Sequence, residues 1–168
     1  MIDPAYVQTL ARYNRWQNEN LYAAAATLTD AQRREDRGAF FKSIHATLNH
    51  LLFGDSIWMS RLEGCARPEG VFPGTDLCGD WDKLKRERAA MDQRILAWAG
   101  GLDVSALAGE LVWLSSLQDS QVNKPIWLAV THFFNHQTHH RGQVHAMLTA
   151  AGAKPGETDL VFMKAAAE

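Results

Sequence analysis

Four long stretches of this sequence carry apolar side chains at the three- to four-residue spacing of a helix, and this pattern constrains the fold more than any other feature. The expected helices cover residues 4–28, 40–62, 80–98 and 125–151. Asp3 followed by Pro4 is typical of a helix N-terminus, and Gly100 and Gly152 are typical of helix ends. A short helical turn is expected at residues 30–34. The sequence therefore predicts an all-α fold, a four-helix bundle, and its length predicts one domain over residues 1–168.

The connections between the helices carry further information. Residues 63–79 hold four glycines, two prolines and both cysteines, which predicts a long loop. A connection of this length can cross a whole bundle and leave the second and third helices parallel. Residues 111–123 (LVWLSSLQDSQVN) break the helical pattern, and they predict two short extended pieces, a small hairpin before the last helix.

Charge and hydropathy exclude several classes of protein. The formal net charge is −2, and no basic stripe is present to neutralise phosphates, so nucleic acid is not an expected partner. No apolar run reaches the roughly 18–20 residues that span a bilayer, and the N-terminus lacks the pattern of a signal peptide, so no membrane partner is expected. Cys65 and Cys78 are not spaced as a zinc knuckle, and we expect two reduced thiols in a cytoplasmic protein.

Four of the seven histidines lie within THFFNHQTHHRGQ, residues 131–143. Neutral imidazole is a common ligand of transition metals, and residues four apart on a helix share a face, so His136 and His140 are spaced to bind one ion. The spacing is that of metalloenzymes with an H-E-x-x-H motif, but Gln137 stands where that motif has its glutamate. No acidic residue occurs between Lys124 and Gly156. A protease of that kind is therefore excluded.

The position of each histidine on the last helix separates candidate ligands from surface residues. Measured as rotation around the helix axis from His136, the apolar side chains centre at about 65° and His140 lies at about 40°. His136 and His140 are therefore expected to face the interior of the bundle. His132 lies one turn away from His136 and slightly further from the centre of the apolar stripe. His139 and His145 point away from the core and are expected at the surface or in an interface.

A third ligand must come from another helix, because catalytic zinc usually has three protein ligands and an open position. His50 is the best candidate, since it lies within about 40° of the centre of a small second apolar face of the second helix. His45 competes with it but belongs to neither apolar face. The alternative, that all these imidazoles are ordinary hydrogen-bonded side chains, stays open from spacing alone.

Several other residues have two possible roles each. Asp55 lies on an apolar stripe, so we expect either an ion pair or hydrogen bond with a residue such as Asn14 or Arg141, or a contact that orients an imidazole. Arg141 is expected to fix a contact between helices rather than to bind an anionic substrate. Gly142 is expected to permit close helix packing. Most tryptophans are expected in the core, with Trp58 and Trp113 as candidates for the mouth of a pocket.

Four segments together resemble a known family. They are RYNRWQNENL (12–21), LNHLLFGDSIWMSRL (48–62), NHQTHHRGQ (135–143) and TDLVFM (158–163). They resemble the DinB-like family of metal-binding four-helix bundles over nearly the whole chain. The resemblance implies an up-down-down-up topology, a homodimer, and a divalent metal held by His50, His136 and His140. His132 is then an additional residue, either a fourth ligand or a group that supports the ligands.

The resemblance also implies a range of chemistry. Members include thiol-dependent transferases and proteins described as metal-dependent hydrolases. We therefore expect a metal-dependent enzyme that activates a thiol or a water, of S-transferase or hydrolase type, with a small-molecule substrate. The expected cofactors are a divalent transition metal, zinc or nickel first, and a low-molecular-weight thiol. The alternative is a stress-responsive protein that binds a metal or small molecule without turnover.

Overall fold

The chain is mostly helical, with one small sheet. The computed structural model describes residues 2–70, 72–115 and 119–164. Within these ranges the α-helices are α1 (Pro4–Ala26), α2 (Asp30–Arg34), α3 (Ile44–Leu62), α4 (Trp81–Gly100) and α5 (Ile126–Ala150). The strands are β1 (Glu110–Ser115) and β2 (Ser120–Pro125), and two 3₁₀ turns, η1 and η2, cover Ser105–Leu107 and Leu160–Phe162. The expectation of an all-α chain is therefore too simple, because the expected hairpin forms a regular two-stranded sheet.

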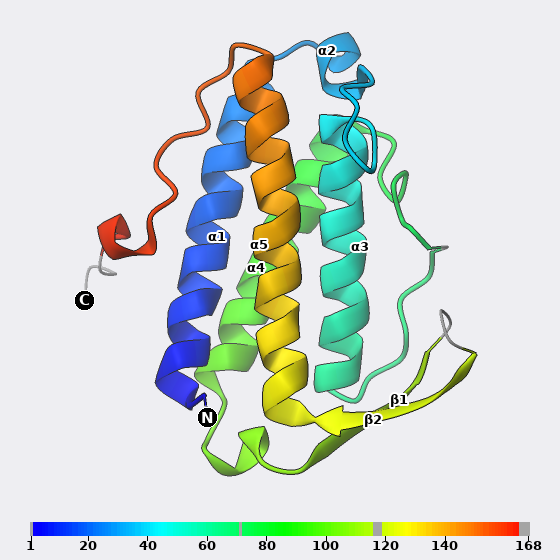
Figure 1. Cartoon of the computed structure of the whole chain (residues 1–168), viewed down its shortest axis with the longest axis vertical. Coiled ribbons are helices and arrows are strands. Elements are labelled where there is room, and N and C mark those ends of the chain that lie inside the picture. Colours follow the sequence, from blue (N-terminus) through cyan, green and yellow to red (C-terminus); the bar gives the residue numbers. More distant parts are fainter. Residues whose placement is uncertain (1, 71, 116–118, 165–168) are drawn as a thin grey trace.

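The four long helices lie side by side (Figure 1). Helix α1 packs against α4 and α5, and α3 packs against the same two helices. In the view of Figure 1, α1 and α5 run upward and α3 and α4 run downward. The parallel course of α3 and α4 follows from the long connection, which returns beside α3 to the top of the molecule. No helix within the described ranges combines the length and the apolar character needed to cross a membrane.

The start of α3 differs from the sequence-based expectation. The periodic pattern predicts a helix from residue 40, whereas α3 begins at Ile44. Lys42 has a φ of 67°, which a right-handed helix does not permit. Ser43 then caps the helix, because its hydroxyl oxygen accepts a hydrogen bond from the amide of Ala46. The apolar side chains before Ile44 thus belong to a turn that precedes the helix. The other long helices agree with expectation to within two residues.

The hairpin has two different faces. Trp113 pairs with Val122 in the antiparallel register, and side chains alternate between faces along each strand. The face that carries this pair is directed toward α3 and α5, and it lines a cavity there. Leu114 lies on the other face and is 74% exposed. Part of the expected hairpin segment, residues 116–118, lies outside the described residues.

A network of buried polar side chains crosses the apolar core. The Asp55 carboxylate on α3 forms an ion pair with Arg88 of α4, with 2.7 Å between Oδ2 and the guanidinium nitrogen. Arg88 also lies 3.0 Å from Asp92 on its own helix. The amide of Gln137 on α5 donates to the other oxygen of Asp55 at 3.0 Å. All four side chains are at most 5% exposed, so each depends on its partners in place of water.

Helix α1 completes this network. The amides of Asn14 and Asn18 donate to one oxygen of Asp92, at 3.2 and 2.8 Å. The guanidinium of Arg141 on α5 donates to the amide oxygen of Asn14. The expected ion pair of Asp55 is therefore confirmed, but its expected partners are wrong, since Asn14 and Arg141 bind each other. The structural role expected for Arg141 is confirmed by this contact.

Burial changes the pKa values of two members of the network. Removal from water raises the pKa of Asp92 to about 6, although Arg88 and the amide of Asn18 partly oppose the shift. Burial also lowers the pKa of Arg141 to about 10. Asp92 therefore titrates in the folded protein at a pH where an exposed aspartate is already ionised.

The raised pKa of Asp92 predicts how pH acts on stability. As the pH rises from the ordinary aspartate value of 3.8 toward 6, the unfolded chain releases this proton first, so the folded state loses stability. Asp92→Asn removes this titration and keeps an oxygen for Asn14 and Asn18. Its free energy of unfolding relative to the unaltered protein should rise between about pH 4 and about pH 7, by up to about 3 kcal/mol.

Chemical denaturation of both proteins at a series of pH values measures this difference. The comparison cancels the effect of the buried histidines, whose lowered pKa values make stability rise with pH in both proteins. A relative free energy that stays constant over the whole range would contradict the prediction.

Candidate metal centre

Three histidines meet where α3 and α5 lie side by side. His50 comes from α3, and His136 and His140 lie one turn apart on α5. One ring nitrogen from each lies within 4.8 Å of the other two, so the group could hold a metal ion. It is the one group of three or more His, Cys, Asp or Glu side chains of this kind in the described part of the chain. The structure thus brings together the three candidates that the sequence and the resemblance indicated.

The spacing of the ring nitrogens fits a small divalent ion. The Nε2 atoms of His50 and His136 lie 3.3 Å apart. Two ligands at about 2.0–2.1 Å from a tetrahedral zinc are roughly 3.4 Å apart. The ring centroid of His140 lies 4.7 Å from that of His50 and 4.6 Å from that of His136. The three rings therefore surround one point.

Hydrogen bonds orient two of the rings. Nδ1 of His50 lies 2.5 Å from the carbonyl oxygen of Pro73 in the loop before α4, and Nδ1 of His140 lies 2.9 Å from the amide oxygen of Gln143. Both oxygens can only accept, so Nδ1 carries the proton in each ring and Nε2 keeps its lone pair. An imidazole held in this way by a second hydrogen bond is typical of a metal ligand.

Of the three, His136 has the most strongly lowered pKa, although its side chain is more exposed than those of His50 and His140. Burial lowers its pKa to about 3, with further contributions from His140 and His50. Burial also lowers the pKa of His50 and of His140. All three rings are therefore neutral near pH 7. Nδ1 of His136 is buried and has no hydrogen-bond partner among the described residues.

Gly54 leaves space for the ring of His136, a role that was not predicted from the sequence. A Cβ atom at this position of α3 would lie 2.8 Å from Cε1 of His136, closer than a carbon contact allows. A glycine inside a helix lowers the stability of the helix by roughly 1 kcal/mol relative to alanine. A glycine four residues after His50 could therefore have indicated a close contact at this position. The close-packing role expected for Gly142 is wrong, since no atom lies within 4 Å of a Cβ built there.

The other histidines lie outside the group. His45 is buried, and its Nε2 lies 3.0 Å from the carbonyl oxygen of Cys78. The ring of His132 packs against Trp58 at an interplanar angle of 57°, with 4.8 Å between the ring centroids, and it lies 6.0 Å from the ring of His136. His139 is exposed, as expected, although its ring contacts His140. His145 is partly exposed.

Two cavities border the three histidines. The larger, of about 660 Å³, extends from His50 and His136 past Trp58 to the hairpin at Trp113, so both tryptophans line it as expected. The smaller, of about 330 Å³, lies on the side of His140 and is walled by aromatic rings, including Phe41. The ring of Phe41 lies 3.9 Å from that of His50, centroid to centroid, and limits the access of water there.

No described residue that lines either cavity is acidic. Asp55 is five residues after His50, but its two oxygens are bound by Arg88 and Gln137. Among the described residues no hydrogen bond joins it to an imidazole, so the structure assigns it to the network of the core. The two cavities therefore offer imidazole nitrogens without a carboxylate that could act as a general base.

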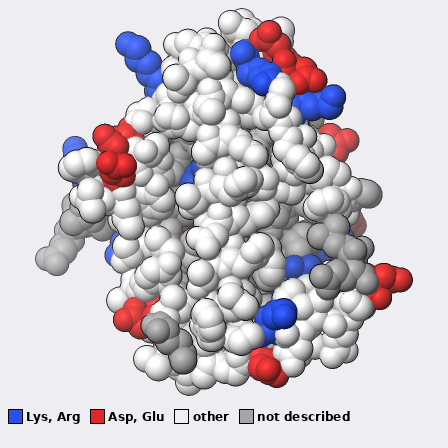
Figure 2. Space-filling model, in the orientation of Figure 1, with Lys and Arg blue, Asp and Glu red and all other residues white. Residues whose placement is uncertain are grey.

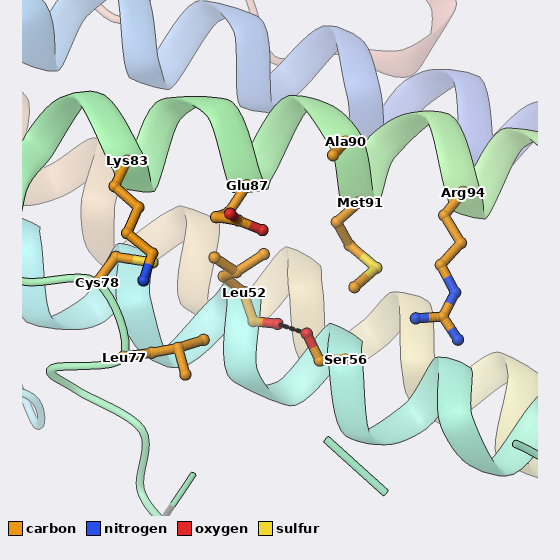
Figure 3. A pocket seen from close by; sticks show the side chains of 9 residues that line it. All are labelled: Leu52, Ser56, Leu77, Cys78, Lys83, Glu87, Ala90, Met91 and Arg94. Carbon is orange, nitrogen blue, oxygen red and sulfur yellow. Dashed lines mark hydrogen bonds between the residues drawn. The ribbon is translucent and has the colours of Figure 1, made fainter. Parts of the chain in front are cut away.

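A third cavity, of about 380 Å³, lies between α3 and α4 away from the histidines (Figure 3). Cys78 and Lys83 lie together at one end of it, and Arg94 lies at the other. Burial raises the pKa of the Cys78 thiol, which makes it a poorer nucleophile. Cys65 and Cys78 are free thiols, as expected, and no histidine lines this cavity.

The contact at Gly54 yields a test of the geometry. Gly54→Ala should displace the His136 ring and weaken the affinity for Zn²⁺ by about tenfold or more, since ligand positions tolerate little shift. Gly142→Ala is the matched control, a glycine of α5 with open space around it, and should leave the affinity unchanged. Isothermal titration with zinc on chelator-treated protein measures both. Equal affinities for the two variants would contradict the role of Gly54.

Comparison with known proteins identifies the family of this chain. The model of the DinB family matches residues 1–168. The chain is also 25% identical over 167 residues to Protein DinB of Bacillus subtilis (strain 168), an alignment that covers 89% of this chain and 88% of that protein. The family match covers α3 and α5, with all three histidines. This chain belongs to the DinB family.

Proposed function

We propose that the protein is a divalent-metal-dependent enzyme that activates a thiol or a water at His50, His136 and His140. The observation that carries the proposal is the convergence of three neutral imidazoles on one point, with two Nε2 atoms 3.3 Å apart. Bound at that point, zinc or nickel supplies the Lewis acidity that deprotonates a thiol or water near neutral pH. Three protein ligands leave a position open for that group.

The surroundings of the histidines favour a thiol over water. A free thiol has a pKa near 8.5 and bulk water one near 15.7, so the thiol needs a far smaller shift to react at pH 7. The described walls of both cavities offer no carboxylate to remove a proton. We therefore infer an S-transferase that uses a low-molecular-weight thiol, with hydrolysis as the second reaction type.

The size of the larger cavity supports a small-molecule substrate. Its volume of about 660 Å³ lies within the range of roughly 300–1,000 Å³ that is typical of ligand sites. His50 and His136 form one end of it, so a molecule bound there reaches the open position. The smaller cavity beside His140 offers room for a second reactant from the other side.

A binding protein without turnover is the alternative. The lack of a carboxylate near the histidines favours it as well, because many hydrolytic metal sites include such a base. In this case the cavity holds a ligand that is not transformed. A dependence of product formation on both metal and thiol separates the two functions.

Other aspects of the protein follow from the family resemblance. We infer that α1, α3, α4 and α5 form the up-down-down-up four-helix bundle of the family. A homodimer and a cytoplasmic location stay predictions. On the face in Figure 2, positive and negative side chains are interspersed, mostly near the edge, without a continuous positive area among the described residues. This distribution supports the inference that nucleic acid is not a partner.

Replacement of each proposed ligand tests the metal site. His50→Ala, His136→Ala and His140→Ala should each lower the affinity for Zn²⁺ by about 100-fold or more, because two imidazoles hold the ion poorly. His145→Ala is the control, a partly exposed histidine of the same helix that lines neither cavity. Equilibrium dialysis with elemental analysis measures occupancy. Full occupancy of His136→Ala would show that the ion binds elsewhere.

Turnover tests the proposed chemistry. The zinc-loaded protein should consume an electrophile such as 1-chloro-2,4-dinitrobenzene in the presence of a low-molecular-weight thiol, and chelation should abolish the reaction. The rate with thiol should exceed the rate of hydrolysis without it, for the pKa reason given above. Absence of metal-dependent turnover over a panel of thiols and electrophiles would favour the binding protein.

A further inference from the structure

The larger cavity has a wall of positive charge at the end away from the histidines. Arg61 on α3, Arg67 in the following loop and Lys124 on β2 line it, and none of its described lining residues is acidic. Three cations around one cavity are unexpected in a chain whose formal net charge is −2. The cavity thus concentrates one sign of charge, which attracts ligands of the opposite sign.

These three cations have no ion-pair partner among the described residues. Glu63, the acidic residue nearest to Arg61 in the sequence, is bound by Arg94 at 2.8 Å. Burial and the charge of Arg67 lower the pKa of Arg61, which shows that its surroundings oppose its charge. An anion beside Arg61 would remove this unfavourable electrostatic energy.

The position of Arg61 is fixed by aromatic rings. Its guanidinium carbon lies 4.7 Å from the ring centroid of Trp58 and 5.1 Å from that of Trp113. Guanidinium groups bind aromatic faces well and keep their N–H donors free at the edge. Arg61 is therefore held in place with donors available to a ligand, which a mobile surface arginine is not.

The rest of the cavity wall is mostly apolar, with Ser115 and His132 as its other polar side chains. Phe53, Ile57 and Leu128 line it together with the two tryptophans. His50, which begins the cavity, and Trp58, which carries the guanidinium, are eight residues apart on α3, or about 12 Å along the helix axis. A ligand that reaches from one end to the other is therefore elongated, with an apolar body between its ends.

We propose that this cavity binds an elongated organic carboxylate whose anionic group pairs with Arg61 and whose apolar body lies against Trp58 and Trp113. Arg67 and Lys124 add to the attraction of the carboxylate. The far end of the molecule lies at His50 and His136, so this proposal rests on the proposed function only for the place of the reacting group. The substrate class of the enzyme is then an amphipathic carboxylic acid.

The test uses two fluorescent probes that differ in one group. 1-Pyrenebutyrate has an aromatic body and a carboxylate on a short chain, and 1-pyrenebutanol has a neutral hydroxyl in its place. Energy transfer from tryptophan to pyrene measures the dissociation constant of each. The carboxylate should bind about tenfold more tightly than the alcohol, as expected for a charge-assisted hydrogen bond to a partly buried arginine.

Variants of the cations locate the carboxylate. Arg61→Gln should abolish the preference for pyrenebutyrate and leave pyrenebutanol unchanged, while Arg61→Lys should retain part of it. Arg12→Gln is the control, an arginine of α1 that contacts Thr9 and lines neither cavity. Lys124→Gln, on the exposed hairpin, should reduce the preference for pyrenebutyrate over pyrenebutanol two- to threefold. This variant tests the proposal if Arg61→Gln does not fold.

Three outcomes would overturn the proposal. They are equal affinity of the two probes for the unaltered protein, a preference that persists in Arg61→Gln, and equal loss of both probes in a folded Arg61→Gln. If Arg61→Gln does not fold, an unchanged preference in Lys124→Gln overturns it too. Each titration is done with zinc-loaded and with chelator-treated protein. A failure of the metal site would leave the probe preference intact, so the two proposals fail separately.

Discussion

The buried ion pair between Asp55 and Arg88 is the contact on which the arrangement of the helices depends. Neither charge is stable in an apolar interior without partners, and those partners come from α3, α4 and α5. Helix α1 joins the network through Asp92, which binds Asn14 and Asn18. A shift of one helix along another would leave a buried charge unpaired, at a cost of several kcal/mol. The network therefore fixes the position of each helix along its axis relative to the others, which apolar packing alone defines less strictly.

The same network sets the geometry of the histidines. Gln137, which binds Asp55, directly follows His136, and Asp55 is five residues after His50. The bond between α3 and α5 thus places His50 opposite the turn that carries His136 and His140. A metal site made from two helices needs such a reference point, because ligand nitrogens must meet within a few tenths of an ångström. The polar core supports the site without taking part in it.

Sequence patterns predicted the features that depend on one segment and missed those that depend on two. Helical spacing predicted the long helices and the pair His136 and His140, because both are periodic within one helix. His50 needed the family resemblance, since no local pattern shows which face of α3 meets α5. The partners of Asp55, the space that Gly54 leaves and the carbonyl of Pro73 were missed for the same reason. Each is a contact between segments far apart in the chain, and neither spacing nor propensity encodes it.

The long connection between α3 and α4 does more than reverse the chain. It supplies the carbonyl that orients His50, the ring of Phe72 that borders both cavities, and the charge of Arg67. If the proposed metal and carboxylate sites are correct, one stretch of loop influences the affinity for the ion and the choice of ligand together. During evolution, loops usually diverge faster than helices. Here, divergence that changes the ligand must preserve the peptide group behind His50, so new specificities are expected to arise on either side of Pro73 while its backbone stays in place.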